Sequence, residues 1–526
     1  MNLQAVSSAG NAILCPKIQS CIPKQDLKGR SVAIIGLGKS GISATKLALA
    51  RGASVLAIDE NEKLVPLGQN ILSEKHSCLK TILGQFDHEL LKEADVIVVS
   101  PGVPLKNYGL SLLLQSGKRV MSELDFAAEV LPSCTKVLAV TGTNGKSTVA
   151  TFAGQILHQL NIETFVGGNL GIPLSEAAFQ CITSCPERFL QVAVVEVSSY
   201  QLEIPYKFFH PSVAVILNLT PDHLERHKTM ENYAMTKCRV FSHMTDKKIA
   251  ILPLGNSYLN EAIAGHENEC NFAWIGAHPG VKIDMEARIA NFEVPTIKHV
   301  SQLPLSAMKT IGTQNYYNAA VAALSVIGLD LGINDAAIYS TIGNLRAPPH
   351  RMEVVHKDSH GITWVDDSKA TNVDATYTGL MGLKELKAVV LLGGLAKASD
   401  VQGSNGFERL VKTLKYHRGV ITVCCIPFCW ILSSVIAYTL RIEFQLKTVF
   451  FEKFGSAGIM IQNTLSSNGL NIPCIRARDL KDAVRLAKSM AKTGDAIVLS
   501  PGCASFDEFR NFEHRGKFFQ ELAFSK

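Results

Sequence analysis

The segment Thr141-Gly142-Thr143-Asn144-Gly145-Lys146-Ser147-Thr148 determines the fold expected for this chain. An apolar run, residues 137–140, precedes it, and an amphipathic helical pattern follows it. A strand, a glycine turn, a Lys-Ser/Thr pair and a helix together form a triphosphate-binding loop, because backbone N–H groups and the helix N-terminus face the phosphates. We therefore predict such a loop here, in which Lys146 adds a positive charge and a hydroxyl reaches Mg²⁺.

This loop is a shortened form of the usual phosphate-binding pattern. The usual first glycine precedes the Gly-Lys pair by several residues, at the position of Val140, whereas the first glycine here is Gly142. A chance turn rich in Gly, Ser and Thr is the alternative, but the strand and helix signals on either side argue against it. The residues predicted to contact the triphosphate are Gly142, Thr143, Asn144, Gly145, Lys146, Ser147 and Thr148.

Length and charge restrict the class of protein. The 526 residues predict about three domains at roughly 150 residues each. A hydrophobic share of 47% with 19% charged residues is typical of a folded protein. The net charge of +6 is small, and the sequence has no Lys/Arg-rich run, which argues against a nucleic-acid partner. A modest positive charge suits a small polyanionic substrate such as a nucleotide. We expect a monomer that needs no membrane.

Cysteine usage and two unusual segments bear on where the protein acts. The thirteen cysteines are dispersed without a C-x-x-C pair, which favours a reducing compartment and hence the cytoplasm. Residues 1–28 are either an organelle transit segment or a disordered extension. If the segment is a transit segment and the source is a plant or an alga, the protein is expected in the plastid stroma. Residues 419–440 carry no charge and are long enough for a membrane helix, although Pro427 interrupts them.

The pattern of strands and helices predicts an α/β protein of three domains. A strand at 31–35, the segment Gly36-Leu37-Gly38-Lys39-Ser40-Gly41, a helix, and a second strand that ends in Asp59 form a βαβ unit. A lone G-x-G-x-x-G is weak evidence for a dinucleotide, and its secure content is an anion site at a helix N-terminus. A further strand at 96–99 leads to Ser100.

The second and third units repeat this alternation of strands and helices. In the second unit, one strand ends in Glu196 and another, at 213–217, is followed by Asn218 and then His223, so these polar residues are expected at the carboxyl edge of a parallel sheet. We predict a Rossmann-like domain at 29–131, a central ATPase-like parallel sheet at 132–347 and a Rossmann-like C-terminal domain at 348–526.

These motifs together resemble the Mur ligase family. Residues 365–372 read Val-Asp-Asp-Ser-Lys-Ala-Thr-Asn, which is similar to the (N/D)DSKATN of its D-glutamate-adding branch, and the segment from Ser500 to Gly516 matches as well. The resemblance covers residues 30–420 and 450–524. It implies ATP-dependent addition of D-glutamate to UDP-N-acetylmuramoyl-L-alanine in peptidoglycan precursor synthesis, through an acyl phosphate, with ATP and Mg²⁺ as cofactors.

The resemblance also implies roles for individual residues. Lys146, Glu196, His223 and Lys237 would be catalytic, with Ser147, Glu196, His223 and a carbamylated Lys237 holding Mg²⁺. Adenine, ribose and phosphates would be contacted by Asn315, Asn318, Asp367 and Arg351. The UDP-muramoyl substrate would be held by Gly36, Leu37, Gly38, Lys39, Ser40, Asp59, Ser100 and Asn169, and the region that receives D-glutamate would include Lys369, Thr371, Lys397, Ser505, Phe506 and Phe512.

Several of these assignments have ordinary alternatives. His223 would otherwise be a loop residue, Lys237 a surface lysine and Asn315 a helix cap. Phe512 would equally suit a core position. A buried lysine, in contrast, loses its proton readily and then reacts with CO₂, which reverses its charge.

The chain departs from the family pattern in its third unit. The segment from Gly394 to Lys397 is less polar than in the family, and residues 424–450 resemble an insertion. A translated intron or a faulty gene model would explain the insertion, and a membrane anchor is the alternative. The competing functions are a ligase like folylpolyglutamate synthase and an ATP-binding protein inactivated by the insertion. A dehydrogenase is not expected, because it would leave the phosphate loop unexplained.

Overall fold

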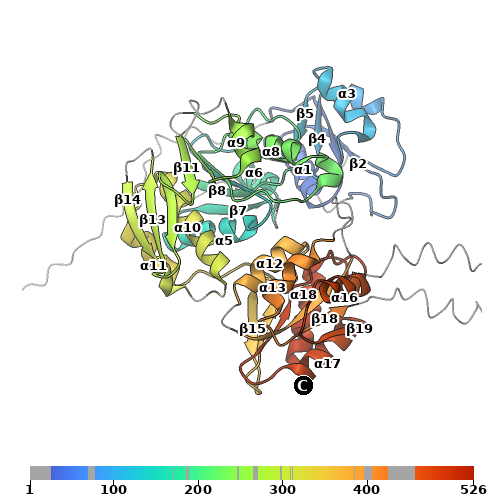
Figure 1. Ribbon diagram of the computed structural model, residues 1–526. Helices are drawn as coiled ribbons and strands as arrows, with labels where there is room; N and C mark the ends of the chain where they lie inside the picture. Colours follow the sequence, from blue (N-terminus) through green and yellow to red (C-terminus); the bar gives the residue numbers. More distant parts are fainter. Residues whose placement is uncertain are drawn as a thin grey trace, which may run out of the picture. The chain divides into compact units, whose positions relative to one another are not determined.

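The computed structural model describes residues 25–68, 78–169, 171–184, 189–245, 248–264, 271–295, 299–308, 310, 312–383, 386–395, 405–423 and 457–525. These residues form three β-sheets with helices around them (Figure 1). Their contacts divide the chain into two compact units. The first unit holds the first sheet and the central sheet, and the second holds the C-terminal sheet together with residues 285–288 and 305–319.

The first sheet is entirely parallel, in the order β3-β2-β1-β4-β5. Its strands Ser31–Ile35 and Val96–Val99 are largely apolar and buried, because helices cover both faces of a parallel sheet, whereas the edge strand Leu79–Leu83 is partly exposed. Its elements are β1 (Ser31–Ile35), α1 (Lys39–Ala50), β2 (Ser54–Asp59), β3 (Leu79–Leu83), α2 (Leu90–Glu93), β4 (Val96–Val99), η2 (Asn107–Gly109), α3 (Leu110–Gln115), β5 (Val120–Ser122) and α4 (Glu123–Ala128).

The central sheet has the order β14-β13-β12-β11-β10-β9-β6-β8-β7. The seven strands from β12 to β7 in this order, β6 included, pair in parallel. At the other edge, β13 pairs antiparallel with both β12 and β14. Its strands are β6 (Lys136–Thr141), β7 (Thr164–Gly168), β8 (Val192–Glu196), β9 (Val213–Ile216), β10 (Ile249–Pro253), β11 (Asn271–Ile275), β12 (Gly280–Asp284), β13 (Ile289–Val294) and β14 (His299–Pro304).

Helices and short helical turns connect these strands. The phosphate-loop helix α5 follows β6 directly, so the end of a central strand delivers the loop to the carboxyl edge of the sheet. The helices and turns are α5 (Lys146–Gln159), α6 (Leu174–Thr183), α7 (Leu224–His227), α8 (Met230–Cys238), η3 (Arg239–Phe241), α9 (Ser257–Ile263), η4 (Leu305–Ala307), α10 (Thr313–Gly328) and α11 (Asp335–Ile342).

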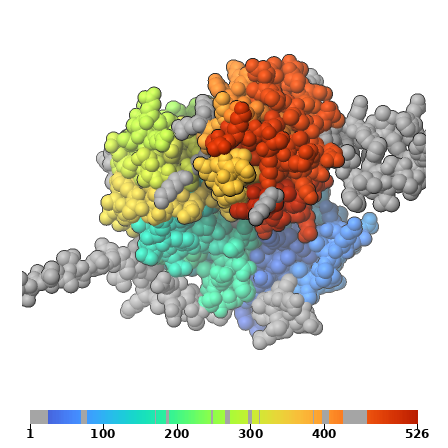
Figure 2. Space-filling model, turned by 90° about the horizontal axis from the view of Figure 1, so that it is seen from below, coloured from blue at the N-terminus to red at the C-terminus, as the bar shows by residue number. Residues whose placement is uncertain are grey.

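The first sheet and the central sheet belong to one compact unit. Helices α1 and α4 of the first sheet pack against α6 of the central sheet. Figure 2 accordingly shows the blue surface of the first sheet continuous with the teal surface of the central sheet. Two buried carboxylates of α4 contribute to this packing: Glu123 accepts hydrogen bonds from Ser175, and Asp125 accepts backbone N–H groups from Lys207 to Phe209.

The C-terminal sheet has the order β15-β16-β20-β17-β18-β19 and is parallel except for the edge strand β15. Helix α17 shows how the sequence produces the packing, because its buried residues Leu480, Ala483, Val484 and Ala487 recur at helical spacing. The elements are β15 (Glu353–Lys357), β16 (Thr363–Asp366), α12 (Val373–Met381), β17 (Ala388–Gly393), η5 (Phe407–Leu410), α13 (Val411–Leu414), β18 (Gly419–Val423), α16 (Ala457–Ser467), β19 (Cys474–Ala477), α17 (Leu480–Met490), β20 (Ala496–Leu499) and α18 (Phe512–Phe524).

The α/β class and the three largely parallel sheets are as predicted, and the antiparallel strands β13, β14 and β15 are additions that the sequence pattern did not indicate. The first residues of the apolar stretch 419–440 form the buried strand β18. The rest of that stretch, the whole proposed insertion 424–450, residues 1–24 of the extension 1–28, and Lys397 lie outside the described residues. Within the described part of the chain, no helix is both long and apolar enough to cross a membrane.

Candidate active site

The phosphate loop follows β6 and opens α5. Gly142 and Gly145 have φ of +140° and +87°, a left-handed region that favours glycine. A Cβ added at Gly142 would lie 3.0 Å from Leu217 Cβ, so a side chain there would also crowd the residue that follows β9. The loop thus presents its backbone at the N-terminus of a 14-residue helix, where anions bind favourably.

Residues that follow β9 hold the loop in shape. Asn218 accepts the Asn144 N–H at 2.9 Å through Oδ1 and donates from Nδ2 to the Asn144 carbonyl at 3.0 Å. Thr143 Oγ1 donates to the Thr220 carbonyl and accepts its N–H. This bracing by Asn218 and Thr220 was not predicted, although a polar residue directly after a buried strand was a usable signal.

Glu196 joins the phosphate loop to a second loop. This carboxylate ends β8, is 3% exposed, and accepts a hydrogen bond from Ser147 Oγ at 2.7 Å. Its other oxygen accepts from Asn169 Nδ2 at 3.2 Å, and its carbonyl accepts the Asn169 N–H at 2.8 Å. The structure therefore brings Ser147, Glu196 and Asn169 together, at a point where a hydroxyl and a carboxylate offer the oxygen ligands that Mg²⁺ prefers.

Two lysines meet at one carbonyl of the phosphate loop. Lys146 Nζ donates to the Gly142 and Thr143 carbonyls, both at 2.8 Å, and Lys237 Nζ donates to the Gly142 carbonyl at 3.1 Å. Lys237 is 1% exposed and lies over the Tyr233 ring, 4.6 Å from its centroid. Burial, and then the charge of Lys146, lower the pKa of Lys237 well below its ordinary value. The alternative of a surface lysine is therefore wrong.

His223 lies in an aromatic and acidic surrounding at the start of α7. It has φ of +57°, and its Nδ1 is 2.8 Å from the Tyr200 hydroxyl. Asp222 approaches the other ring nitrogen at 3.6 Å. His227, which the sequence did not single out, is buried and hydrogen-bonds Ser199 at 2.9 Å, and burial lowers its pKa to about 4.

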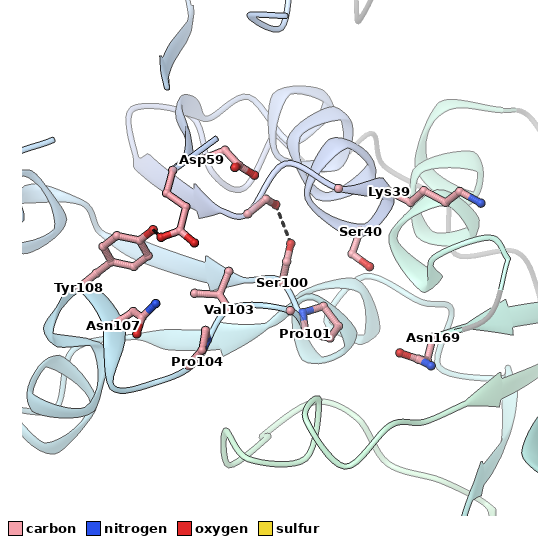
Figure 3. Close-up of a pocket in the computed structure, with 14 residues that line it drawn as sticks. Lys39, Ser40, Asp59, Ser100, Pro101, Val103, Pro104, Asn107, Tyr108 and Asn169 are labelled. Carbon is pink, nitrogen blue, oxygen red and sulfur yellow. Dashed lines mark hydrogen bonds between the residues drawn. The ribbon is translucent and has the colours of Figure 1, made fainter. Parts of the chain in front are cut away.

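The glycine segment after β1 borders a cavity of about 410 Å³ (Figure 3). Asp59 shapes its wall, because its carboxylate accepts the Leu37 N–H at 2.6 Å and the Asn61 N–H at 2.9 Å. Ser100 Oγ donates to the Gly36 carbonyl at 2.7 Å. Of the predicted substrate residues in this region, those that line the cavity are Gly36, Gly38, Lys39, Ser40, Asp59, Ser100 and Asn169, whereas Leu37 does not.

In the C-terminal unit, Asp367 is a buried acid. Its two oxygens accept hydrogen bonds from Ser500 Oγ at 2.7 Å and from the Met352 N–H at 3.2 Å. Burial raises its pKa to about 7, against the lowering effects of the Ser500 hydrogen bond and of the Arg351 charge. Asp367 thus titrates near neutral pH beside Arg351.

The other predicted residues of this unit lie in different surroundings. Lys369 Nζ is 5.2 Å from the centroid of the Phe512 ring, and Phe512 is partly buried at the start of α18. Ser505 is buried, whereas Phe506 is 70% exposed. Thr371 is half-buried, and its N–H donates to the Lys369 carbonyl. Asn315 and Asn318 are buried near the start of α10, one helical turn apart.

A buried network that sequence reasoning missed supports the D-D-S-K segment. His350 Nδ1 is 2.7 Å from Asp366 Oδ2, which also accepts from Gln520 Nε2 at 2.8 Å. The backbone N–H of His350 donates to Glu353 at 2.8 Å, and Gln520 Nε2 also donates to Glu353 at 3.3 Å. The ligand atoms of His350, Glu353 and Asp366 lie within 4.8 Å of one another. Arg515 completes the support by donating to the Ser368 hydroxyl and carbonyl.

This geometry coincides with similarity to a known family. Residues 140–326 match the family model of the Mur ligase middle domain, and residues 30–122 match that of the Mur ligase MurD-like N-terminal domain. The chain belongs to the Mur ligase family, whose members are ATP-dependent enzymes that form amide bonds.

Curated relatives and solved structures refine this similarity. The chain is 31% identical to the protein named UDP-N-acetylmuramoylalanine--D-glutamate ligase of Koribacter versatilis (strain Ellin345), over 94% of this chain and 98% of the relative. It is 32% identical to the protein of the same name from Desulfatibacillum aliphaticivorans, with the same two coverages. Solved structures similar in fold include UDP-N-acetylmuramate-alanine ligase MurC and MurF ligase in complex with ADP, both from Thermotoga maritima. Each has a TM-score of 0.54 and 16% identity to this chain. The MurC match covers 94% of this chain and 99% of the MurC chain, and the MurF match covers 95% of this chain and 97% of the MurF chain.

Proposed function

We propose that the chain catalyses the ATP-dependent addition of D-glutamate to UDP-N-acetylmuramoyl-L-alanine, through an acyl phosphate. The names of its relatives and the D-D-S-K segment support this substrate pair. The observation that carries the proposal is the position of Glu196, which hydrogen-bonds both Ser147 of the phosphate loop and Asn169 of the cavity. A single carboxylate thus connects the group that binds triphosphate with the cavity proposed for the acceptor substrate.

The residues of the phosphate loop fit the charge that the reaction must neutralise. A carboxylate and a triphosphate repel each other, so the barrier is electrostatic. Lys146 and the N–H groups at the start of α5 would hold the phosphates. Ser147, Glu196 and His223 would hold Mg²⁺, which when bound neutralises phosphate charge. His223 fits least well, because Mg²⁺ prefers oxygen ligands.

We propose that Lys237 carries a carbamate. Its depressed pKa favours the neutral amine, whose lone pair would attack CO₂ and whose displaced proton would leave to solvent. The resulting carboxylate would add a negative group beside the loop and assist in holding Mg²⁺. Uptake of carbon-13-labelled bicarbonate, detected as a carbamate resonance that the Lys237→Met variant lacks, tests this modification; a wild-type spectrum without that resonance would rule it out.

The first sheet and the C-terminal unit would supply the remaining contacts. The cavity lined by Gly36, Lys39 and Ser40 would hold the UDP part of the substrate, with its diphosphate at the N-terminus of α1. In the C-terminal unit, Asp367 would contact ribose, and Arg351 the phosphates of ATP. Adenine would contact Asn315 and Asn318, and D-glutamate the group Lys369, Thr371, Lys397, Ser505, Phe506 and Phe512.

The proposed reaction has two balanced steps. The substrate carboxylate attacks the γ-phosphorus of ATP, forming a carbon–oxygen–phosphorus link and releasing ADP. The neutral amine of D-glutamate then attacks the acyl carbon, the phosphate leaves with one of the former carboxylate oxygens, and the amine loses a proton. We infer further that the enzyme acts as a cytoplasmic monomer on small molecules, in line with its modest charge and dispersed cysteines.

Phosphate release from ATP tests the proposal. The wild-type chain should release phosphate only when UDP-N-acetylmuramoyl-L-alanine and D-glutamate are both present. Glu196→Gln should reduce this rate by about 10²–10³-fold, since an uncharged amide cannot replace the carboxylate at the loop. The matched control is Glu163→Gln, which changes an exposed carboxylate directly before β7 of the same sheet and should keep the wild-type rate.

The same assay separates the competing functions. Phosphate release that requires a folate and glutamate would favour the folylpolyglutamate-synthase-like ligase. ATP binding without any release would favour a nucleotide-binding protein that has lost its activity.

A further inference from the structure

One wall of the first-sheet cavity is formed by the loop that follows β4. This wall is residues 100–104, which all line the cavity and continue toward Tyr108 (Figure 3). Two of these residues are prolines, which lack a backbone N–H and so reduce the hydrogen bonds that the wall can form by itself. A Cβ added at Gly36 would lie 2.8 Å from Val103 Cγ2, so the wall packs directly against the glycine segment before α1. Any displacement of the wall therefore changes the shape of the cavity.

Arg226, a side chain of α7 in the central sheet, holds this wall from outside the cavity. Its Nη1 donates to the Pro101 carbonyl at 3.2 Å, and its Nη2 donates to the Val103 carbonyl at 3.1 Å. Both sheets belong to one compact unit, so the contact lies within that unit. A guanidinium suits this task, because its N–H donors are fixed in one plane and can reach two carbonyls at once.

The guanidinium of Arg226 is itself fixed by the loop that follows β8. Glu203 accepts from Arg226 Nε at 2.8 Å and from Nη2 at 2.6 Å, which is a bidentate ion pair. The centroid of the Tyr200 ring lies 4.0 Å from Arg226 Cζ, so the cation also packs on an aromatic face. The side chains of Arg226 and Glu203 are only 17% and 15% exposed, and solvent therefore screens the pair weakly. Arg226 is held in one orientation, which it imposes on the wall.

The two elements that carry Arg226 and its partners also carry residues of the proposed active site. The loop of Tyr200 begins at Glu196, which contacts the phosphate loop and Asn169. Helix α7 begins after His223, whose Nδ1 is 2.8 Å from the Tyr200 hydroxyl. Arg226 thus connects the cavity wall to the surroundings of the phosphate loop. Such a connection matters for the proposed reaction, because the reacting atoms must lie about 3–3.5 Å apart.

We propose that Arg226 is a positioning residue that fixes the wall 100–104 for the acceptor substrate; this inference rests on the proposed function. Arg226 does not line the cavity, and it reaches the wall through backbone carbonyls only. It therefore acts on the substrate through the wall. A residue that only stabilised the fold would alter the binding of every ligand alike, whereas a residue that positions the wall alters the binding of the acceptor substrate selectively.

Binding of two ligands to the full chain, measured by calorimetry, tests this inference. Arg226→Met should weaken UDP-N-acetylmuramoyl-L-alanine roughly tenfold, because the wall is no longer pre-organised, and should raise its KM in parallel. The affinity for ADP, measured without Mg²⁺, should stay unchanged, since the phosphate loop keeps its contacts. Arg226→Lys keeps the charge but lacks the planar fork, so it should weaken the acceptor substrate less, roughly threefold.

The matched control is Arg239→Met. Arg239 Nη1 donates to the Leu202 and Glu203 carbonyls of the same loop, but Arg239 does not line the cavity. Its replacement loosens that loop without removing a donor from the wall. This variant should therefore keep the wild-type affinity for the acceptor substrate.

The outcomes separate this inference from the function on which it rests. Wild-type affinity for the acceptor substrate in both Arg226 variants would overturn the positioning role, while phosphate release that requires both substrates would still support the ligase. Equal losses for ADP and the acceptor substrate would also overturn it, because they would indicate a general effect on the fold. A wild-type chain that does not bind UDP-N-acetylmuramoyl-L-alanine would overturn both proposals. If circular dichroism shows that Arg226→Met does not fold, Arg226→Lys alone decides.

Discussion

The phosphate-loop region and the C-terminal unit each bury an ionisable side chain, Lys237 and Asp367, but the two groups are balanced differently. Burial and the charge of Lys146 both act to remove the proton of Lys237. At Asp367, burial favours the protonated acid, whereas Ser500 and Arg351 favour the carboxylate. Lys237 is therefore biased strongly toward one state, and Asp367 is poised between two, with a pKa of about 7.

This difference bears on function. A lysine whose neutral form is favoured can attack CO₂, which suits the carbamate proposed at the phosphate loop. An acid poised near neutrality changes its charge with small changes in its surroundings, which suits a group that contacts a ligand only during the cycle. The two regions therefore predict different responses to substitution and to pH.

The largest expected effect concerns Lys237. Lys237→Met should reduce phosphate release by about 10²–10³-fold, because it removes the group proposed to become a carbamate. The free energy of unfolding should stay unchanged or rise, since an apolar side chain of similar length carries no cost of burying an amine. Steady-state kinetics and urea unfolding measure the two effects.

Lys248→Met is the matched control, because Lys248 is a half-buried lysine of the same unit with no proposed role. It should keep its activity. A Lys237→Met enzyme with near-wild-type activity would remove Lys237 from the mechanism.

The next effect concerns Asp367. The native state binds its proton between the ordinary pKa of 3.8 and about 7, whereas the unfolded state does not. The stabilisation from the protonated Asp367 is therefore fully present below pH 3.8 and is lost as pH rises through about 7. The free energy of unfolding should fall by at least about 1 kcal/mol across this range. Asp367→Asn should remove this pH dependence and raise the KM for ATP roughly tenfold, the loss of one hydrogen bond to a charged group.

Urea unfolding of Asp367→Asn and of the wild type across this pH range measures the difference. The same pH dependence in both proteins would show that Asp367 is ionised throughout, and an unchanged KM would remove it from the ATP contacts.

A smaller effect is expected where α18 packs against the His350 network. A Cβ at Gly516 would lie 2.1 Å from His350 Nδ1 and 2.8 Å from Asp366 Oδ2. Gly516→Ala should therefore lower the free energy of unfolding by roughly 1–3 kcal/mol. Gly68→Ala is the control, since its Cβ would approach only the Pro66 carbonyl, at 3.8 Å. Equal stability of the two variants would mean that α18 can shift without cost.

The smallest effect concerns His227 in the phosphate-loop region. Its native pKa of about 4 lies below its ordinary 6.5, so the unfolded state binds more protons between these values. Stability should fall as pH decreases through this window, by about 1 kcal/mol or less, and His227→Phe should abolish that slope. Thermal unfolding of both proteins as a function of pH provides the measurement, and an unaltered slope would assign the effect to other groups.

Much of the fold was predictable because its determinants are local. The segment 141–148, with apolar and helical residues on either side, defines a strand, a turn and a helix by itself. Glu196 could be expected at the same sheet edge, because parallel strands end together. Its pairing with Ser147 follows from the adjacency of β6 and β8.

The remaining features depend on contacts between distant segments. The bracing of Asn144 by Asn218 requires β9 to lie beside β6, an order that the sequence pattern leaves open. The contact of Asp366 with His350 and Gln520 joins the end of β16 and the segment before β15 to the last helix. The position of Tyr108 depends on a left-handed backbone conformation for which a tyrosine gives no signal.

The fate of the substrate carboxylate oxygens tests most directly the claim that the phosphate loop and the cavity form one site joined by Glu196. UDP-N-acetylmuramoyl-L-alanine labelled with oxygen-18 in its alanyl carboxylate should be incubated with the enzyme, ATP and D-glutamate, and the released phosphate analysed by mass spectrometry. The proposed mechanism predicts that each phosphate molecule carries a single labelled oxygen. Unlabelled phosphate, released together with product, would show that the carboxylate never attacked ATP and would contradict it.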